Sequence, residues 1–426
     1  MRTPPELTST AHPNHPVQEA QRAVQDILSA SQRHGAYRDA CLGLVPTENR
    51  LSPLAQRAMT GDLSHRYLFQ NPQWRYVGGK HLAEIESEAQ RLACEVFGAQ
   101  YANVRPLSGE NCTNIVIHAV LPEGGAFYHL AMEDGGHFAA ASVADRLTND
   151  RHLLPCDPTS GGLDLEACAI AFAAVPPDVI YLDASMMLRA HPIRELRALV
   201  GPEPIIVYDA SQVFGLLAGG TFQDPLEEGA DILSGSTHKS LPGPQKGMIL
   251  TRRADLMERI EATIFPGHVS NFHLHHVAAL AVTLAESQAF GRAYAEATIA
   301  NARALAAGLA RCGLSVQTDA PHTDSHQVWL DVTDVATPDE AVERLHDANL
   351  IANVNLLPTL RAKGLRLGTP EVTRLGMGVQ EMDVIAGLMH DALAHTRPIG
   401  EVQADVLALA ERFRGVHYAF PADLVA

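Results

Sequence analysis

The sequence lacks the features that mark several common classes of protein. Its 426 residues carry a formal charge of −17, and no run or patch of basic residues stands out in the sequence. Both features argue against a nucleic-acid partner. No apolar stretch is long and uncharged enough to span a bilayer, and the N-terminus lacks the apolar core of a signal peptide. The six cysteines form no Cys-x-x-Cys pair, as is typical of reduced thiols. We therefore expect a cytoplasmic protein without a membrane partner.

Length and composition predict two folded domains. A hydrophobic content of 46% with 19% charged residues is ordinary for a globular protein, and the length exceeds that of a usual single core. The first 16 residues or so are polar and rich in proline, so we expect them to be disordered or to lie as an arm on a partner. The expected divisions are an N-terminal arm and helix over 1–55, a large domain over 56–276, a connecting helix over 277–312 and a small C-terminal domain over 313–426.

Alternating apolar runs and helical patterns predict a mostly parallel sheet. Helical stretches at 163–174 and 192–200 separate some of the candidate strands. The candidate strands are 127–132, 179–182, 205–208, 231–233 and 246–250. Ligands of such a sheet bind at the carboxyl ends of the strands.

Two residues at the ends of predicted strands suggest pyridoxal phosphate (PLP). Lys239 follows the apolar run that begins at Asp231, and Asp209 ends the run at 205–208. A desolvated lysine has a depressed pKa and a free lone pair, as Schiff-base chemistry requires. An aspartate at a neighbouring strand end can keep the pyridine nitrogen protonated. The alternative is a loop lysine and a helix-capping aspartate.

Other polar groups lie at similar positions, and each has a structural alternative. Ser108 and Gly109 begin a helix and suit a phosphate, although serine is also a common helix cap. His137 follows two glycines and could lie over a planar ligand or simply belong to a turn. Arg366 precedes Gly-Thr-Pro and could grip a carboxylate or form an interdomain salt bridge. Glu48 could equally be a solvated or capping carboxylate.

Three histidines, His273, His275 and His276, raise the question of a metal site. The cluster has no nearby carboxylate or cysteine ligand, and histidines at a helix start are more often capping or interfacial groups. We expect no metal.

The chain resembles the serine hydroxymethyltransferase family of fold-type I PLP enzymes from about residue 40 to the C-terminal region. The likeness rests on short motifs that occur in the family's order. These are Thr47–Asn49, Arg75–Gly79, Phe97–Ala99, Tyr101–Val104, Ser108–Gly109, Gly135–His137, Thr237–Lys239, Gly243–Pro244, Phe265–Gly267 and Arg366–Pro370. The resemblance implies an α/β fold of the aspartate aminotransferase-like type, with a mostly parallel seven-stranded sheet and a smaller C-terminal αβ domain. It also implies a homodimer with shared active sites.

The same resemblance implies roles for individual residues. Lys239 would carry PLP as the internal aldimine, Asp209 would pair with the pyridinium nitrogen and His137 would stack on the ring. Arg366 would bind the α-carboxylate of an amino-acid substrate. Glu48 and Tyr67 would lie beside the reacting groups. The remaining candidates are Ser108, Gly109, Gln212 and His238 for cofactor binding, and Phe69, Tyr76 and Glu48 for substrate binding.

Several positions depart from the family pattern. Phe69 replaces a carboxylate that transfers protons and senses folate, and Tyr76-Val77 retains only one of two paired tyrosines. Gln212 replaces a histidine. These departures disfavour folate-dependent serine–glycine exchange. Phe69 and Phe272 would give an apolar lining that favours a substrate bulkier than serine.

Four reactions or roles stay open. We favour aldolase or transaldolase chemistry at the Cα–Cβ bond of a β-hydroxy amino acid, with Glu48, Tyr67 or His137 as the base. One alternative is β-elimination or decarboxylation of an S-substituted cysteine conjugate, as in lincosamide antibiotic pathways. A true serine hydroxymethyltransferase and a non-catalytic PLP-binding homologue are the others. The retention of Lys239, Asp209 and Arg366 argues against the last.

Overall fold

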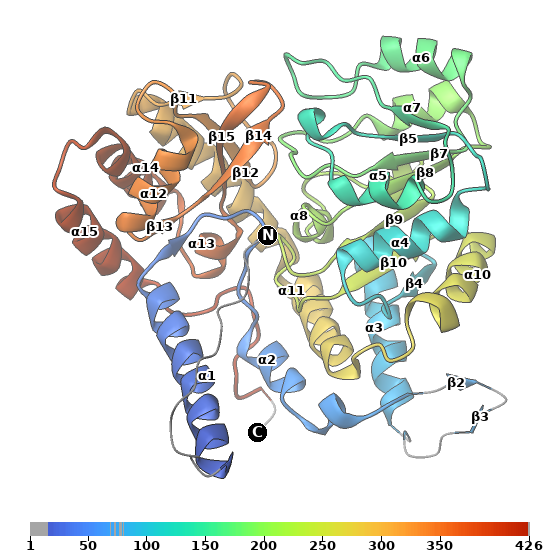
Figure 1. The fold of residues 1–426 in the computed structure, drawn as a ribbon, viewed down its shortest axis with the longest axis horizontal. Helices are drawn as coiled ribbons and strands as arrows, with labels where there is room; N and C mark the ends of the chain where they lie inside the picture. The colour runs from blue at the N-terminus through green and yellow to red at the C-terminus, as the bar shows by residue number, and fades with distance from the viewer. Residues whose placement is uncertain (1–15, 69, 72–73, 76–78, 80, 425–426) are drawn as a thin grey trace.

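The computed structural model describes residues 16–68, 70–71, 74–75, 79 and 81–424. The predicted N-terminal arm over the first 15 residues lies outside the described residues, as do Phe69 and Tyr76. Two αβ regions lie side by side, and the helix α11 (Leu274–Arg311) runs between them (Figure 1). The first part of α11 packs into the core of the larger region, and its last part packs into the core of the smaller one.

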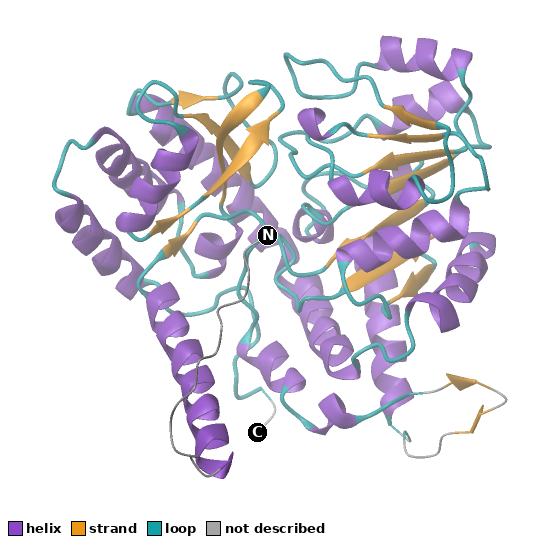
Figure 2. Cartoon of the chain, in the orientation of Figure 1, coloured by secondary structure: helices purple, strands orange, loops and turns teal. Residues whose placement is uncertain are grey.

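A seven-stranded sheet forms the centre of the larger region (Figure 2). The strand β10 is antiparallel to both of its neighbours, and the other pairings are parallel. In spatial order the strands are β4 (Tyr101–Asn103), β10 (Gly247–Thr251), β9 (Ile232–Ser236), β8 (Ile205–Asp209), β7 (Val179–Leu182), β5 (Phe127–His129) and β6 (Arg151–Leu153). The central strands are buried along almost their whole length, as expected of a sheet with helices on both faces. The predicted mostly parallel sheet is confirmed.

Helices connect and flank these strands, and local capping chemistry sets several of their ends. Ser108 accepts a hydrogen bond from the Asn111 backbone N–H at 3.1 Å and so begins α4. Gly98, at φ 61°, ends α3 in the left-handed conformation that glycine adopts without strain. The helices are α3 (Leu82–Phe97), α4 (Gly109–Val120), α5 (Phe138–Ala144), α6 (Leu165–Ala174), α7 (Ile193–Val200), α8 (Phe214–Ala218), α9 (Pro225–Glu228) and α10 (Ala254–Thr263), with short turns η2 (Met132–Asp134) and η3 (Ile264–His268).

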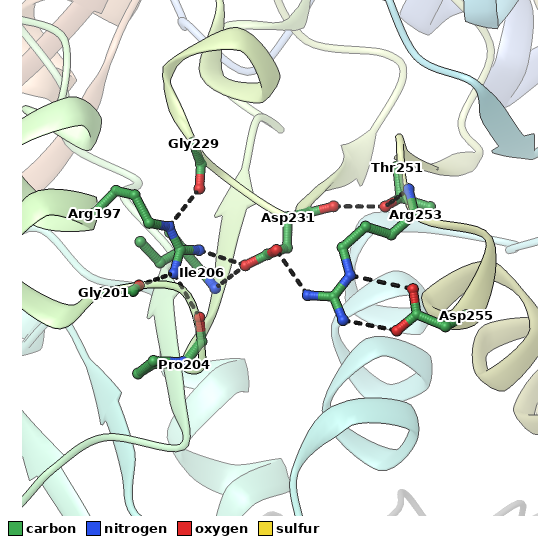
Figure 3. Close-up of polar contacts among 9 residues, drawn as sticks. All are labelled: Arg197, Gly201, Pro204, Ile206, Gly229, Asp231, Thr251, Arg253 and Asp255. Atoms are coloured by element: carbon green, nitrogen blue, oxygen red, sulfur yellow. Dashed lines mark hydrogen bonds and ion pairs between the residues drawn. The ribbon is translucent and has the colours of Figure 1, made fainter.

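Asp231 joins three neighbouring strands at the edge where β8 and β9 begin and β10 ends (Figure 3). Its Oδ2 accepts from the Ile206 backbone N–H at 2.9 Å and from Arg197 Nη2 at 2.5 Å. Its Oδ1 accepts from Arg253 Nη1 at 3.0 Å, and its backbone carbonyl accepts from Thr251 Oγ1 at 2.6 Å. Through its carboxylate and its backbone carbonyl, Asp231 thus links the starts of β8 and β9 to the end of β10.

The smaller region is built on a four-stranded antiparallel sheet. Its strands, in spatial order, are β11 (Ser315–Val316), β12 (Gln327–Asp331), β15 (Ala362–Gly368) and β14 (Asn353–Leu357). Its helices are α12 (Pro338–Asp347), α13 (Pro370–Arg374), α14 (Val379–Ala394) and α15 (Ile399–Arg412). A separate parallel pair, β1 (Leu42–Gly43) with β13 (Leu350–Ile351), ties the N-terminal segment to this region.

The N-terminal helix α1 (Pro16–Asp39) has no buried residue. Its exposed side chains include Val17, Val24, Ile27 and Leu28, and Ile27 is 68% exposed. After it come α2 (Pro53–Met59), the turn η1 (Asp62–His65) and the short strand pair β2 (Gln70–Asn71) and β3 (Trp74–Arg75). No helix in the described part of the chain combines the length and apolar character needed to cross a bilayer.

Candidate functional site

A cavity of about 210 Å³ lies at the carboxyl ends of β7, β8 and β9 and at the start of α4. Seven residues selected from the sequence line this cavity together. They are Ser108, Gly109, His137, Asp209, Gln212, His238 and Lys239. These residues thus share a cavity at the carboxyl ends of the strands, where parallel sheets bind their ligands.

Lys239 is partly buried and opens into this cavity. Burial lowers the pKa of its amine, and the negative charge of Asp209 opposes that shift. The backbone at Lys239 is fixed from the N-terminal segment, because Asn49 Nδ2 donates to the Lys239 carbonyl at 2.8 Å. The lysine therefore offers an amine more easily deprotonated than usual, on a constrained turn.

Asp209 lines the cavity, and one of its carboxylate oxygens is held by the protein. Its Oδ1 accepts from the Ser211 backbone N–H at 2.8 Å. Gly235, at φ +146°, allows this arrangement, since a Cβ there would lie 2.9 Å from that oxygen and 2.5 Å from Ser211 Oγ. A protonated ring nitrogen is the kind of group that such a fixed carboxylate pairs with.

His137 caps α5, and this contact fixes its tautomer. Its Nδ1 accepts from the Ala139 backbone N–H at 3.2 Å, so the neutral ring carries its proton on Nε2. Burial lowers the pKa of this imidazole, which keeps it neutral at neutral pH. Asp183 holds the turn by accepting from the backbone N–H groups of His137 at 3.2 Å and Leu130 at 3.3 Å, and burial raises the pKa of Asp183 to about 8.

The start of α4 suits a phosphate. Ser108 and Gly109 open a helix of 12 residues, where free backbone N–H groups and the helix dipole favour an anion. Gly109 approaches β9 so closely that a Cβ would lie 2.9 Å from the Ser236 backbone nitrogen. Ser236 lines the cavity, and no described residue pairs with its buried hydroxyl oxygen.

Arg366 lies on β15, beside the segment that follows β7. It is 5% exposed, and its Nη1 donates to the Ser185 carbonyl at 3.2 Å. Burial lowers the pKa of the guanidinium to about 10. Its Nε is buried and has no partner among the described residues. A bound carboxylate would satisfy this donor and the charge together.

Glu48 lies apart from the first cavity but borders a second one. This wider cavity, of about 870 Å³, is also lined by Asn49, His238 and Lys239. Glu48 forms an ion pair with Arg38 of α1 at 2.8 Å, and its side chain is 45% exposed. The carboxylate of Glu48 and the side chain of Lys239 therefore border the same wider cavity.

Three predicted contributors, Arg366, Tyr67 and Phe272, are in neither cavity lining. Tyr67 is 50% exposed on the segment before β2. Phe272 was expected to line the substrate pocket, but it is buried in the core with the Arg105 guanidinium 5.1 Å from its ring centroid. The prediction that Phe272 lines the substrate pocket is therefore wrong for the two cavities of this chain, because its ring is packed in the core of the larger region.

The three clustered histidines surround the start of α11, where His273 is the residue that caps the helix. The rings of His275 and His276 lie edge to face at 4.4 Å. Within the described ranges, no group of three or more histidine, cysteine, aspartate or glutamate side chains is arranged to hold a metal.

Asp183 and Ser185 also line the first cavity, although neither was predicted from the sequence. Both follow the predicted strand at 179–182, so the strand-end rule applied to that strand would have found them. Gln327 was also missed. It is fully buried on β12, and its Nε2 donates to the Ser185 carbonyl at 3.0 Å. No local pattern marks it.

These groups fit PLP. The cavity is lined by an amine with a lowered pKa, a carboxylate fixed through one oxygen and a helix start suited to phosphate. The unpaired Ser236 hydroxyl and Arg366 Nε add polar atoms that a ligand would satisfy.

Comparison with known proteins agrees with this donor set. The family model described as serine hydroxymethyltransferase matches residues 18–389. The serine hydroxymethyltransferase of Methanopyrus kandleri is 39% identical over 408 residues, which cover 93% of this chain and 95% of that protein. The corresponding protein of Methanocella arvoryzae is 38% identical over 418 residues, with 94% and 97% covered.

A solved structure extends the comparison. The crystal structure of L-threonine transaldolase from Pseudomonas fluorescens in its internal aldimine state matches with a TM-score of 0.90 and 29% identity over 96% of both chains. Together the family match and this neighbour establish fold type I and PLP as the cofactor. The chain is a PLP-dependent enzyme and belongs to the serine hydroxymethyltransferase family.

Proposed function

We propose that this enzyme cleaves the Cα–Cβ bond of a β-hydroxy amino acid by aldolase or transaldolase chemistry and does not depend on folate. The observation that carries the proposal is the likeness, over 96% of both chains, to a protein named L-threonine transaldolase. The sequence supports it, since Phe69 stands where the family has a proton-transferring carboxylate.

The chain's own residues would divide the work as follows. Lys239 would hold the cofactor covalently, Asp209 would keep the ring nitrogen protonated and Ser108 and Gly109 would bind the phosphate. Arg366 would bind the α-carboxylate of the amino acid through its unpaired Nε and a terminal nitrogen. Bound PLP supplies an electron sink that stabilises negative charge at Cα.

The proton of the substrate's β-hydroxyl must go to another group. His137 is poorly suited as the base, because its Nδ1 is occupied and its Nε2 already carries the proton. Glu48 is a carboxylate that shares the wider cavity with Lys239. We assign the role of base to Glu48, and Arg38, at 2.8 Å, orients it.

A substrate panel tests the proposal. Purified enzyme would be given threonine, bulkier β-hydroxy amino acids, S-substituted cysteines and serine with or without tetrahydrofolate, and the products would be identified. Formation of glycine and an aldehyde without folate supports the proposal. Pyruvate with a released thiol would instead show β-elimination and overturn it.

A second candidate is true serine hydroxymethyltransferase activity. It is favoured by the relatives at 38 to 39% identity that carry this name. Fast glycine formation from serine that requires tetrahydrofolate would establish it. Borohydride reduction and peptide mapping apply to either reaction, and should place a pyridoxyl group on Lys239.

We also propose that the enzyme is a homodimer with shared active sites. The helix α1 has no buried residue and exposes Val17, Val24, Ile27 and Leu28, which recur at helical spacing. We assign this exposed apolar face of α1 to contact with a second copy of the chain. The same helix carries Arg38, which lines the wider cavity together with Lys239, so a partner bound to α1 would lie near the site.

Light scattering and subunit mixing test this assembly. Val24→Glu and Ile27→Glu should convert a dimer to a monomer, whereas Gln25→Glu, also on α1, should leave the dimer intact. Mixing inactive Lys239→Ala with impaired Tyr67→Phe should restore activity if Tyr67 serves the partner's site. A monomeric wild type would contradict the proposal.

A further inference from the structure

Gln327 joins the two halves of the enzyme at the cavity. It lies on β12 of the smaller sheet and is fully buried, but its side chain bonds to groups of the larger region. Its Oε1 accepts from the Met187 backbone N–H at 3.1 Å, and its Nε2 donates to the Ser185 carbonyl at 3.0 Å. Both partners belong to the segment that follows β7.

The partners of Gln327 determine which end of its amide is oxygen. The backbone N–H of Met187 and the indole N–H of Trp329, at 3.2 Å, can only donate, so the atom that faces them is the oxygen. The carbonyl of Ser185 can only accept, so the atom that faces it is the nitrogen. Exchanging the two ends would set donor against donor and acceptor against acceptor.

This fixed orientation determines how Gln212 faces the cavity. The second hydrogen of Gln327 Nε2 points to Gln212 Oε1 at 3.3 Å. The oxygen of Gln212 is therefore occupied, and Gln212 lines the cavity. Its amide nitrogen is left as the group that can donate to a ligand.

Arg366 depends on the same carbonyl. Ser185 O accepts from Gln327 Nε2 at 3.0 Å and from Arg366 Nη1 at 3.2 Å. The other terminal nitrogen of Arg366 bonds to the Asn353 side chain at 3.0 Å once that amide is oriented to satisfy both groups. Gln327 thus contacts the groups that position both Gln212 and Arg366.

We propose that Gln327 is a positioning residue with two effects. It orients the Gln212 amide so that the amide N–H group donates to an acceptor oxygen of the bound cofactor. It also holds the Ser185 carbonyl that contacts Arg366. The second part rests on the proposed binding of a substrate carboxylate by Arg366. An amide does not titrate in the accessible pH range, so the donor is present at every working pH.

The test uses holoenzyme carrying Gln327→Met, Gln212→Met or Ser325→Ala. Methionine keeps an unbranched chain of similar length but cannot donate. Ser325 is the control for the same contact between the two halves, because its hydroxyl donates to the Met187 carbonyl at 2.6 Å and accepts from the Gln327 backbone N–H at 3.1 Å, whereas Ser325→Ala leaves the Gln327 side-chain amide in place. Thermal unfolding would show that each variant folds.

Two measurements distinguish loss of the positioning role of Gln327 from a general loosening of the contact between the two halves. The first is a pH titration of the bound cofactor's absorbance, which needs no substrate. Gln327→Met and Gln212→Met should shift its midpoint in the same direction, each by at least about 0.5 pH unit, while Ser325→Ala should not. The second is the affinity for glycine, which Gln327→Met should lower about tenfold more than Gln212→Met does.

The outcomes are distinguishable. If Gln327→Met leaves the absorbance titration unchanged, or if Ser325→Ala shifts it equally, the role assigned to Gln327 is overturned. If the wild type shows no reaction with β-hydroxy amino acids, the proposed function fails while the absorbance titration still decides the role of Gln327.

Discussion

The side chain of Asn49 donates to the backbone carbonyl of Lys239 at 2.8 Å, although 190 residues separate the two in sequence. The same Nδ2 lies 3.2 Å from the Ser240 carbonyl and 2.8 Å from Tyr294 Oη. Tyr294 Oη in turn donates to the Ser240 carbonyl at 3.1 Å. The N-terminal segment and α11 together hold the turn that carries the amine.

Replacing Asn49 should loosen this turn. Asn49→Ala removes the side-chain donor of the Lys239 carbonyl and one of the two side-chain donors of the Ser240 carbonyl, which costs about 1–3 kcal/mol of folding free energy. We expect a lower Tm and faster loss of the cofactor, measured by calorimetry and by dialysis against a PLP trap. Asn49→Asp keeps the size but sets an acceptor against the carbonyls, so it should be at least as harmful. Equal cofactor retention in both variants and the wild type would refute the assignment.

Lys246 should make stability depend on pH. Its amine is fully buried against three backbone carbonyls, with Phe272 O closest at 2.8 Å, and burial lowers its pKa from 10.5 to about 7. Between these two pH values the unfolded chain holds a proton that the folded chain lacks. Stability should therefore rise with pH from about 7 to 10.5, by at most about 5 kcal/mol.

Urea unfolding across this range would measure the effect. Lys246→Met removes the titrating group, so subtracting its curve from that of the wild type isolates the contribution of Lys246 from those of other groups. A difference that stays constant from pH 7 to pH 10 would contradict the expectation.

The ion pair between Arg374 and Glu286 should be sensitive to loss of either partner. The side chains are 1% and 2% exposed, and Nη2 lies 3.0 Å from Oε2. Glu286→Gln or Arg374→Met leaves a buried charge without its partner, at a cost of about 3–5 kcal/mol. The double variant Glu286→Leu with Arg374→Met should be less harmful than the sum of its single changes. Additive losses in denaturant unfolding would show that the pair is not coupled.

Arg366→Lys should weaken amino-acid binding while leaving the cofactor in place. Lysine keeps the charge but lacks the planar fork that grips a carboxylate with two hydrogen bonds. We expect KM for the amino acid to rise about 10- to 100-fold, with PLP content unchanged by absorbance. A conservative control is Arg361→Lys, whose side chain pairs instead with Asp134. An unchanged KM would show that the substrate carboxylate does not bind to Arg366.

The sequence predicted the central strands well, because each is an apolar run between turn residues. Val179–Leu182 was predicted to the residue. Arg151–Leu153 was missed, since its side chains are exposed or partly exposed and form no apolar run. It lies at the sheet's edge, where the pairing comes only from the neighbouring strand.

Site residues could be predicted where an ionisable side chain follows or ends a predicted strand, as at Lys239 and Asp209. It was not predictable where distant segments meet. Gln327 acquires its role only when β12 packs against the segment after β7, and Glu48 acquires its ionic partner only through α1. The domain limits, the cytoplasmic location and a part in antibiotic biosynthesis stay predictions.

The Asp231 contacts lie at one end of β9, and Ser236 and Lys239 follow at the other. A strand of five residues separates the two ends by roughly 16 Å. Substitutions around the coenzyme can therefore accumulate without weakening the anchor. Because the two ends of β9 are separate, residues around the cofactor can change during evolution while the fold is retained.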